Sequence, residues 1–227
     1  QTLVEQPQSL GQNWVSLKKA LEQSDLPALT ALRCGAAKAN PVDAAGWLQN
    51  VAGLENILVL EKNGQSAAML AAVPVKYGQH RGVWLCGAAG VQGVPMDRLL
   101  PKIMEGCLRA YGASGFDFAV TTPDDARRAE DLKTLGFKSQ LPLRVIQTPI
   151  RRDLLAQASF DSLTVHKLLE MRHIYQPGCI TLPESAMNEI MTQLYRRGLT
   201  VVSNRRGYGL YYTSGDTLQF LELQADN

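Results

Sequence analysis

The fold is decided by residues 54–89, which read LENILVLEKNGQSAAMLAAVPVKYGQHRGVWLCGAA. Apolar and β-branched residues predict strands at Asn56–Glu61, Ala67–Val75 and Gly82–Ala89. Asn63-Gly64 is a strong signal for a two-residue hairpin turn, because both positions of such a turn need positive φ angles. The sequence therefore predicts an antiparallel meander of three strands.

A helix and a further strand follow this meander. Met96–Tyr111 carries apolar residues at helical spacing and is the clearest amphipathic helix of the chain. Phe116–Thr121 is a short apolar strand, so we expect a right-handed β-α-β crossover with a parallel strand pair. A short polar helix at Asp124–Thr134 and a closing strand at Leu143–Thr148 complete the predicted unit.

The flanking segments are predicted from the same signals. We expect helices before the meander at Trp14–Ser24, at Leu26–Cys34 and from Pro41 onward. After the first unit we expect helices at Leu163–Ile174 and Pro183–Arg197, then strands at Leu199–Ser203, Tyr208–Tyr212 and Leu218–Leu223.

This order, helix then three-strand meander, repeats that of residues 42–89. We therefore predict two domains, 1–150 and 151–227, the second being an incomplete repeat of the first. A half-unit leaves sheet edges and an apolar face uncovered, so it should pack on the first unit or on another chain. A homodimer is one such arrangement.

Composition excludes several classes of protein. The 227 residues are 45% hydrophobic and carry a net charge of +2, which does not indicate a nucleic-acid-binding surface. The four cysteines lack metal-ligand spacing and suit reduced thiols in a cytoplasmic protein. We expect no membrane partner, because the apolar runs are shorter than the ~20 residues that cross a bilayer. The polar segment 1–12 does not resemble a signal peptide.

The order of elements in residues 54–137, with the tail Leu132-Lys133-Thr134-Leu135-Gly136-Phe137, resembles the acyl-CoA-binding core of the GNAT family of N-acyltransferases. The resemblance implies an α/β fold with a mixed, mostly antiparallel sheet and flanking helices. The C-terminal α+β half-repeat is similar to the truncated second GNAT-like lobe of some members. The family's strand before the long helix splays from its neighbour and holds the pantetheine arm of the cofactor.

In the family, the loop after that strand carries Arg/Gln-x-x-Gly-x-Gly/Ala, and its amides bind the pyrophosphate. Here Gly90 and Pro95 replace two of these residue types, and no cation comes from this loop. The alternatives are a weakened site for acetyl-CoA or another acyl-CoA and a plain strand-to-helix loop. The cofactor-binding residues that the resemblance implies are Ala88, Ala89, Gln92, Gly93, Val94, Met96 and Asp97.

No catalytic residue is assigned. Leu132 lies where the family has a tyrosine that protonates the departing thiolate, and leucine donates no proton. Leu135-Gly136-Phe137 matches the family, but we interpret it as structural. Among the general-base candidates Glu55, Glu61, Asp117 and Glu222, the last lies on a strand with one mixed face, and the simpler interpretation is a solvated carboxylate.

Other side chains that could carry chemistry have simpler explanations. His166 and His173 share one face of a predicted helix without a third ligand, so we expect a surface pair and no metal site. Cys86 could be a nucleophile, but it has no histidine nearby in sequence and suits a small buried residue. Tyr208, Tyr211 and Tyr212 could line a binding surface or pack in a sheet.

Two functional hypotheses follow. The resemblance implies an N-acyltransferase that moves an acetyl or longer acyl group from acyl-CoA to a small-molecule or peptide amine. The alternative is a non-catalytic GNAT-like binding or interaction protein, which the altered loop and Leu132 favour. A dimer whose composite cleft binds another ligand is a third hypothesis.

Overall fold

The structure is a computed structural model, and it describes residues 16–19, 25–123, 125–138, 146–149, 163–176, 178–204 and 206–226. Contacts divide the chain into two units, which are described separately. Unit 1 comprises residues 1–137 and 180–189, and unit 2 comprises 138–179 and 190–227. The long helix α6 (Glu184–Arg196) contributes residues to both units.

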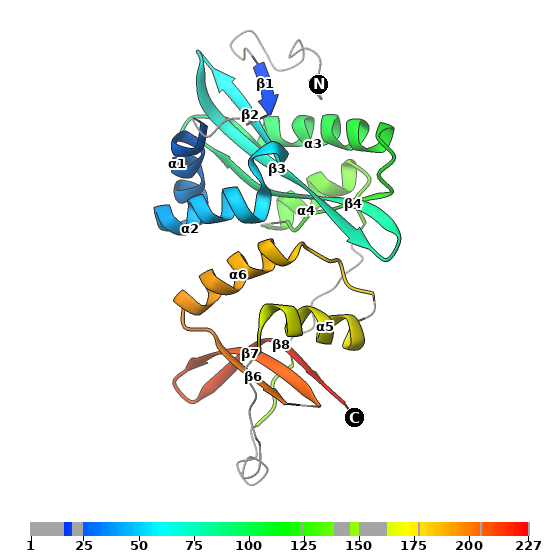
Figure 1. The fold of residues 1–227 in the computed structure, drawn as a ribbon. Coiled ribbons are helices and arrows are strands. Elements are labelled where there is room, and N and C mark those ends of the chain that lie inside the picture. The colour runs from blue at the N-terminus through cyan, green and yellow to red at the C-terminus, as the bar shows by residue number, and fades with distance from the viewer. Residues whose placement is uncertain are drawn as a thin grey trace. The chain divides into compact units, whose positions relative to one another are not determined.

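Unit 1 is built on a five-stranded sheet in the order β1-β2-β3-β4-β5 (Figure 1). Its strands and helices run in the chain order β1 (Ser16–Lys19), α1 (Leu26–Ala37), α2 (Pro41–Gly46), η2 (Trp47–Ala52), η3 (Leu54–Asn56), β2 (Ile57–Lys62), β3 (Gln65–Tyr77), β4 (His80–Gly90), α3 (Met96–Ala113), β5 (Phe118–Val120) and α4 (Ala126–Thr134). All neighbouring strands are antiparallel except β4 and β5, which are parallel. The predicted meander, the parallel pair and the mixed, mostly antiparallel sheet are confirmed.

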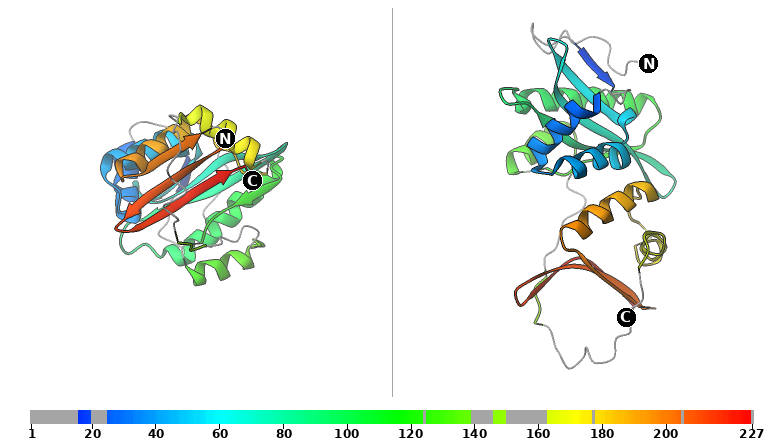
Figure 2. Two further views of the ribbon diagram at one scale, coloured as in Figure 1. Left: turned by 90° about the horizontal axis from the view of Figure 1, so that it is seen from below. Right: turned by 60° about the vertical axis from the view of Figure 1, so that its left-hand side comes forward.

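Helices cover both faces of this sheet (Figure 2). Side chains of β2, β3 and β4 alternate between the faces, so one face packs on α3 and α4 in a core cluster. The other face packs on α1 and η2, which contact β3 and β4. The core cluster contains Leu58, Leu60, Ala68, Leu70, Ala72, Val83, Leu85, Leu99, Leu100, Ile103, Met104, Cys107 and Leu132.

The turns follow the sequence signals. Asn63 and Gly64 have φ angles of 54° and 73°, as the predicted two-residue hairpin turn requires. The helix that starts at Pro41 changes from α to π geometry at Trp47, which the sequence did not indicate. π segments are rare and are frequent at functional sites.

Two sequence-based expectations need correction or fall outside the described residues. Residues 16–19 form β1, antiparallel to β2, instead of part of the predicted helix Trp14–Ser24. Pairing with the neighbouring strand β2 overrides a weak local helical pattern. The rest of that helix, and residues 143–145 of the predicted closing strand, lie outside the described residues. Residues 146–148 form no strand, and Ile146 is 72% exposed.

Unit 2 contains a three-stranded antiparallel sheet in the order β6-β7-β8, with α5 (Val165–Tyr175) over one face (Figures 1 and 2). The strands are β6 (Thr200–Asn204), β7 (Gly207–Ser214) and β8 (Thr217–Ala225), which confirms the predicted helix-and-meander order. Phe220, Leu221 and Leu223 of the edge strand β8 are exposed.

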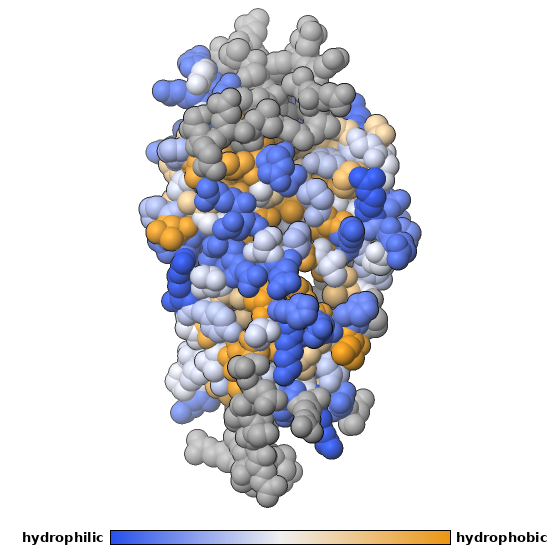
Figure 3. Space-filling model, in the orientation of Figure 1, coloured by the Kyte–Doolittle hydropathy of each residue, from blue (hydrophilic) through white to orange (hydrophobic). Residues whose placement is uncertain are grey.

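The surface of the described residues carries both hydrophilic and hydrophobic side chains. Hydrophilic residues cover much of the face shown in Figure 3, with hydrophobic residues between them. This agrees with the balanced charge of the sequence, 23 Lys and Arg against 21 Asp and Glu.

Candidate functional site

The two parallel strands of unit 1 run side by side for only a short distance. Gly82, Val83 and Trp84 of β4 pair with residues 118–120 of β5, and β4 then continues to Gly90. Within the described residues, positions 85–90 have strand neighbours only on the β3 side. A strand edge without a neighbour presents backbone N–H and C=O groups that can bind an extended ligand.

A β-bulge lies in the part of β4 that has no neighbour on the β5 side. Met69 pairs with Ala89 and Ala71 with Cys86, so β4 contains one extra residue between the two pairs. Gly87 has a φ angle of +64°, and a Cβ atom there would lie 2.4 Å from Cη2 of Trp47. Glycine is required here both by the backbone conformation and by the close approach of the indole ring. Bulges of this kind redirect a strand and often lie next to active sites.

Arg33, Trp47 and Cys86 gather on the α1 side of the bulge. The Cζ atom of Arg33 lies 4.0 Å from the ring centroid of Trp47. Burial raises the pKa of the Cys86 thiol to about 12, and the positive charge of Arg33 lowers it by less. Cys86 is therefore a neutral thiol at pH 7, which supports its interpretation as a small buried residue and not as a nucleophile.

Some backbone amides of the loop after β4 already donate hydrogen bonds to carbonyl groups within the loop. The amide of Val94 donates to the carbonyl oxygen of Val91 at 3.1 Å, and the amide of Met96 donates to that of Val94 at 2.8 Å. Pro95 has no N–H group. Of the non-proline residues 91–97, Gln92, Gly93 and Asp97 have amides without a hydrogen-bond partner in the described part of the chain.

The seven residues predicted for the cofactor thus lie in one continuous segment. Ala88 and Ala89 belong to the bulged end of β4, and Ala89 is buried. Gln92 and Gly93 are exposed in the loop, with Gly93 at a φ angle of +87°. Asp97 lies in the first turn of α3, whose amide dipoles point toward the loop.

A cation approaches this helix end from α4. Nη2 of Arg127 lies 3.4 Å from Oδ2 of Asp97, so the first turns of α3 and α4 are neighbours. Asp125 fixes the start of α4 by accepting a hydrogen bond from the backbone N–H of Arg128 at 2.7 Å. The sequence prediction considered cations in the loop alone, and the loop contains none, so this pair was missed. The dipeptide Arg127-Arg128 at a predicted helix start was the signal that could have found it.

The Leu-Gly-Phe tail is structural, as predicted. Leu132 is 6% exposed and belongs to the core cluster, against which Leu135 and Phe137 also pack. Gly136 follows α4 with a φ angle of +89°. No phenol occupies this position. The nearby hydroxyl of Tyr111 donates to the carbonyl oxygen of Ala72 at 3.1 Å, and burial raises its pKa.

Of the three general-base candidates of unit 1, Asp117 lies away from the bulge. Oδ2 of Asp117 accepts a hydrogen bond from the amide of Arg81 at 2.8 Å and lies 3.6 Å from Nδ1 of His80. At the rise of a β-strand, Arg81 and Gly87 are roughly 20 Å apart, so Asp117 does not reach the bulge. Glu55 is exposed, and Glu61 is half-buried on β2.

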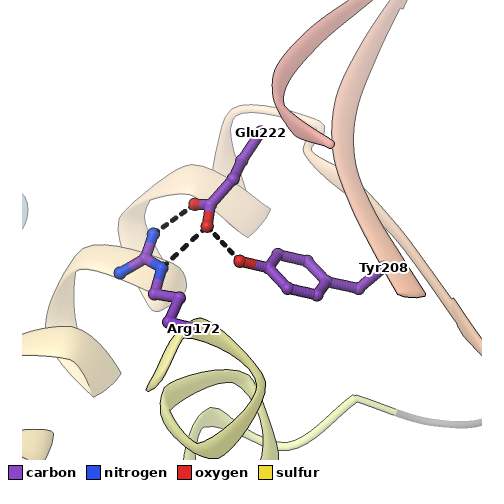
Figure 4. A network of polar contacts seen from close by, with 3 residues as sticks. All are labelled: Arg172, Tyr208 and Glu222. Atoms are coloured by element: carbon purple, nitrogen blue, oxygen red, sulfur yellow. Dashed lines mark hydrogen bonds and ion pairs between the residues drawn. The ribbon is translucent and has the colours of Figure 1, made fainter. Parts of the chain in front are cut away.

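Glu222 is not a solvated carboxylate, which corrects the simpler interpretation of the sequence. It accepts hydrogen bonds from Arg172 of α5 and from the hydroxyl of Tyr208 (Figure 4). The Arg172 Nε–Glu222 Oε1 distance is 2.9 Å, and the Glu222 side chain is 13% exposed. Burial and the bond to Glu222 raise the pKa of Tyr208. The network joins α5 to β7 and β8 within unit 2.

The histidines show no sign of a metal site. His166 is exposed and lies 3.4 Å from Glu170 one turn along α5, and His173 is also exposed. The described residues contain no group of three or more His, Cys, Asp or Glu side chains that could hold a metal ion. No helix in the described part of the chain is long and apolar enough to cross a membrane.

Comparison with known proteins gives a likeness of fold. No protein-family model matches the sequence, and no curated protein matches it. The structure is similar to that of Eis1 from Mycobacterium abscessus, with a TM-score of 0.66 and 13% identity over 94% of this chain. It is also similar to a GCN5-related N-acetyltransferase from Kribbella flavida, with a TM-score of 0.55 and 14% identity over 93% of this chain.

A candidate acetyltransferase from Pyrococcus horikoshii matches 99% of this chain with a TM-score of 0.58 and 10% identity. This chain spans 60%, 58% and 75% of the length of these three proteins, in the order given. The likeness extends over nearly all of this chain. The protein therefore has the fold of the GNAT N-acetyltransferases.

Proposed function

We propose that this protein is an acyl-CoA-dependent N-acyltransferase that transfers an acetyl or longer acyl group to a small-molecule or peptide amine. The observation that carries the proposal is the parting of β4 from β5 after three residue pairs, with a bulge at Gly87 in the unpaired part. The pantetheine arm would pair with the backbone of residues 85–90, and the thioester would lie beside the bulge.

The reaction needs few side chains. The nitrogen of a neutral amine attacks the thioester carbonyl carbon, the C–N bond forms, the C–S bond breaks, and the amine's proton passes to solvent. Backbone amides near Ala88 and Ala89 would stabilise the oxyanion of the tetrahedral intermediate. The thiolate would take its proton from water, since Leu132 lies in the core and donates none.

A second candidate is a GNAT-like protein that binds acyl-CoA or another ligand without catalysis. Its support is the buried Leu132, together with the loop amides of Val94 and Met96 that are already hydrogen-bonded. Binding and turnover therefore have to be measured separately.

The first experiment is isothermal titration of acetyl-CoA into the protein and into two loop variants. Gly93→Trp places a bulky side chain at a positive φ angle, and Gln92→Glu adds a negative charge where phosphates would lie. Gln219→Glu, at an exposed position on β8, is the matched control for the added charge. We expect binding that both loop variants abolish and the control retains.

Turnover is then followed as the release of CoA thiol from acetyl-CoA in the presence of primary amines. Thiol release that depends on the amine supports the acyltransferase. Binding without release from a broad panel of amines favours the non-catalytic alternative. Absence of binding for acetyl-CoA and for longer acyl-CoAs at millimolar concentration contradicts the acyltransferase and leaves a non-catalytic protein that binds another ligand or a protein partner.

A further inference from the structure

The sheet of unit 2 has one covered face and one uncovered face. Glu222 of β8 binds Arg172 of α5, so its side of the sheet faces that helix. No helix of the described residues lies over the other side of the three strands, which we call the outer face (Figure 2). A sheet with apolar residues on a face normally buries them against a second layer. The side chains of the outer face therefore show whether it requires a partner.

The outer face carries apolar side chains from all three strands. Leu223 follows Glu222 and so points to the opposite side, in one cross-strand row with Gly209 of β7 and Val202 of β6. A Cβ atom at Gly209 would lie within 3.4 Å of three side chains, those of Phe220, Val202 and Leu223. The ring of Tyr211 lies 5.2 Å from that of Phe220, measured between centroids. These side chains form one continuous apolar patch centred on Gly209.

Much of this patch is accessible to solvent. Phe220 is 39% exposed and Leu223 is 59% exposed. Leu221, which the register shift in β8 leaves without a partner on β7, is also exposed. Single apolar side chains are ordinary on a protein surface, but neighbouring ones that form a patch mark an interaction site.

The charge of the three strands indicates the kind of partner. Strands β6, β7 and β8 contain one charged side chain, that of Glu222, and it is held by Arg172 on the α5 side. The strands therefore offer no cation to a nucleic acid or an anionic membrane, and no free carboxylate to a basic protein. An uncharged apolar sheet face matches such a surface, and every other copy of this chain carries one.

Two copies of the outer face can pack around a two-fold axis without bringing like charges together. Packed sheets lie about 10 Å apart, with their side chains interdigitated. Three strands and a paired length of eight residues give an area of roughly 400 Å² on each copy. A total near ~800 Å² is at the lower limit of specific interfaces and predicts a weak dimer, with a dissociation constant on the order of 10–100 µM.

We propose that the outer face of unit 2 is a homodimer interface, in which Val202, Phe220 and Leu223 of one copy pack against the same residues of a second copy. The contact uses one patch twice, so it closes on itself and gives a dimer without larger assemblies. The inference does not depend on the proposed acyltransferase reaction, because the residues that form the interface all belong to unit 2.

The test is sedimentation velocity of the full chain from about 1 µM to about 1 mM, a range that brackets this dissociation constant. Leu223→Lys places a charge within the patch. Ser214→Lys is the matched control, because Ser214 is exposed and alternation along β7 places it on the side opposite to Tyr211. The wild type and the control should dimerise equally. Leu223→Lys should bind at least ~10-fold more weakly, since its ammonium group would be buried without a partner.

Thermal melting separates loss of the dimer from loss of the fold. At the lowest concentration Leu223→Lys should melt at the temperature of the wild type, because Leu223 is mostly exposed in the single chain. The Tm of the wild type should rise with protein concentration, whereas that of Leu223→Lys should stay constant. Leu223→Ala adds no charge and should weaken the dimer by a smaller factor, which keeps the test valid if the lysine variant fails to fold.

Three results would overturn the proposal. A wild type that remains monomeric at the highest concentration excludes the dimer and leaves the outer face to a different partner. A dimer that Leu223→Lys and Leu223→Ala both retain at full strength must form through another surface. Assemblies that grow beyond two copies contradict a contact that closes on itself. A dimer that is weakened in Leu223→Lys and retained in Ser214→Lys supports the proposal, whether or not the protein binds acetyl-CoA.

Discussion

Replacing Gly87 by alanine should destabilise the protein through two separable effects. The left-handed conformation at φ +64° costs a residue with a Cβ atom about 1–2 kcal/mol. The new methyl group would also lie 2.4 Å from Cη2 of Trp47, and such overpacking typically costs about 1–3 kcal/mol. We therefore expect Gly87→Ala to lower the free energy of unfolding by about 2–5 kcal/mol in total.

Gly78→Ala is the matched control. Gly78 has a similar φ of +57°, but a Cβ atom there would have no heavy atom within 4 Å. It should therefore show only the backbone part, about 1–2 kcal/mol. Urea unfolding at 25 °C measures both variants, and each kcal/mol corresponds to about 2–4 °C in Tm for a chain of this size.

A third protein isolates the contact with the indole ring. In a Trp47→Leu background the ring is absent, so Gly87→Ala should lose its excess over Gly78→Ala. Equal losses of unfolding free energy for Gly87→Ala and Gly78→Ala in the wild-type background would refute the argument that Trp47 packs tightly against Gly87. An excess that persists without the ring would refute it as well.

Three further predictions concern the buried polar groups and the core. Glu222→Ala leaves Arg172 partly buried without its main partner and should lower the unfolding free energy by about 1–3 kcal/mol. Tyr208→Phe should lower it by less. Chemical denaturation that ranks the two variants in the opposite order would contradict the network. Burial raises the pKa of the Cys107 thiol from 9.0 to about 12, so the thiol loses its proton at lower pH in the unfolded chain than in the folded protein. The free energy of unfolding should therefore fall as the pH rises from 9 toward 12. A pH series of melting curves should show a smaller fall in Cys107→Ala. Leu132→Ala should cost about 2–5 kcal/mol because it opens a cavity in the core cluster, and a variant as stable as the wild type in urea would mean that Leu132 is not a core residue.

Much of unit 1 could be predicted from the sequence because its elements carry strong local patterns. The meander and α3 show clear alternation or helical periodicity, and Asn63-Gly64 marks its turn. Residues 16–19 could not be predicted, since four residues satisfy a helical or an extended pattern equally well and the partner strand decides between them. The π geometry at Trp47 depends on one residue more per turn, which no local pattern reports.

The polar contacts were less accessible because they join residues far apart in the chain. Alternation along β8 shows that Glu222 and Leu223 face opposite sides, but it does not tell which side α5 covers. Nearly all of helix α3 and the whole of strand β5 separate Asp97 from Arg127 in the sequence, although the two residues form an ion pair. The loop residues proposed for the cofactor come from the resemblance, since their glycine and position before a long helix are local features of the sequence.

The short pairing of β4 with β5 also has a consequence for folding. β2, β3 and β4 are joined by tight turns, so their contacts are local and can form early, whereas β5 can join β4 only after the whole of α3 has crossed the sheet. Three residue pairs then hold the parallel edge. We expect the amides of this β4–β5 edge to exchange with deuterium sooner than those of β3, and the edge beside the proposed donor site to assemble after the β2–β3–β4 meander.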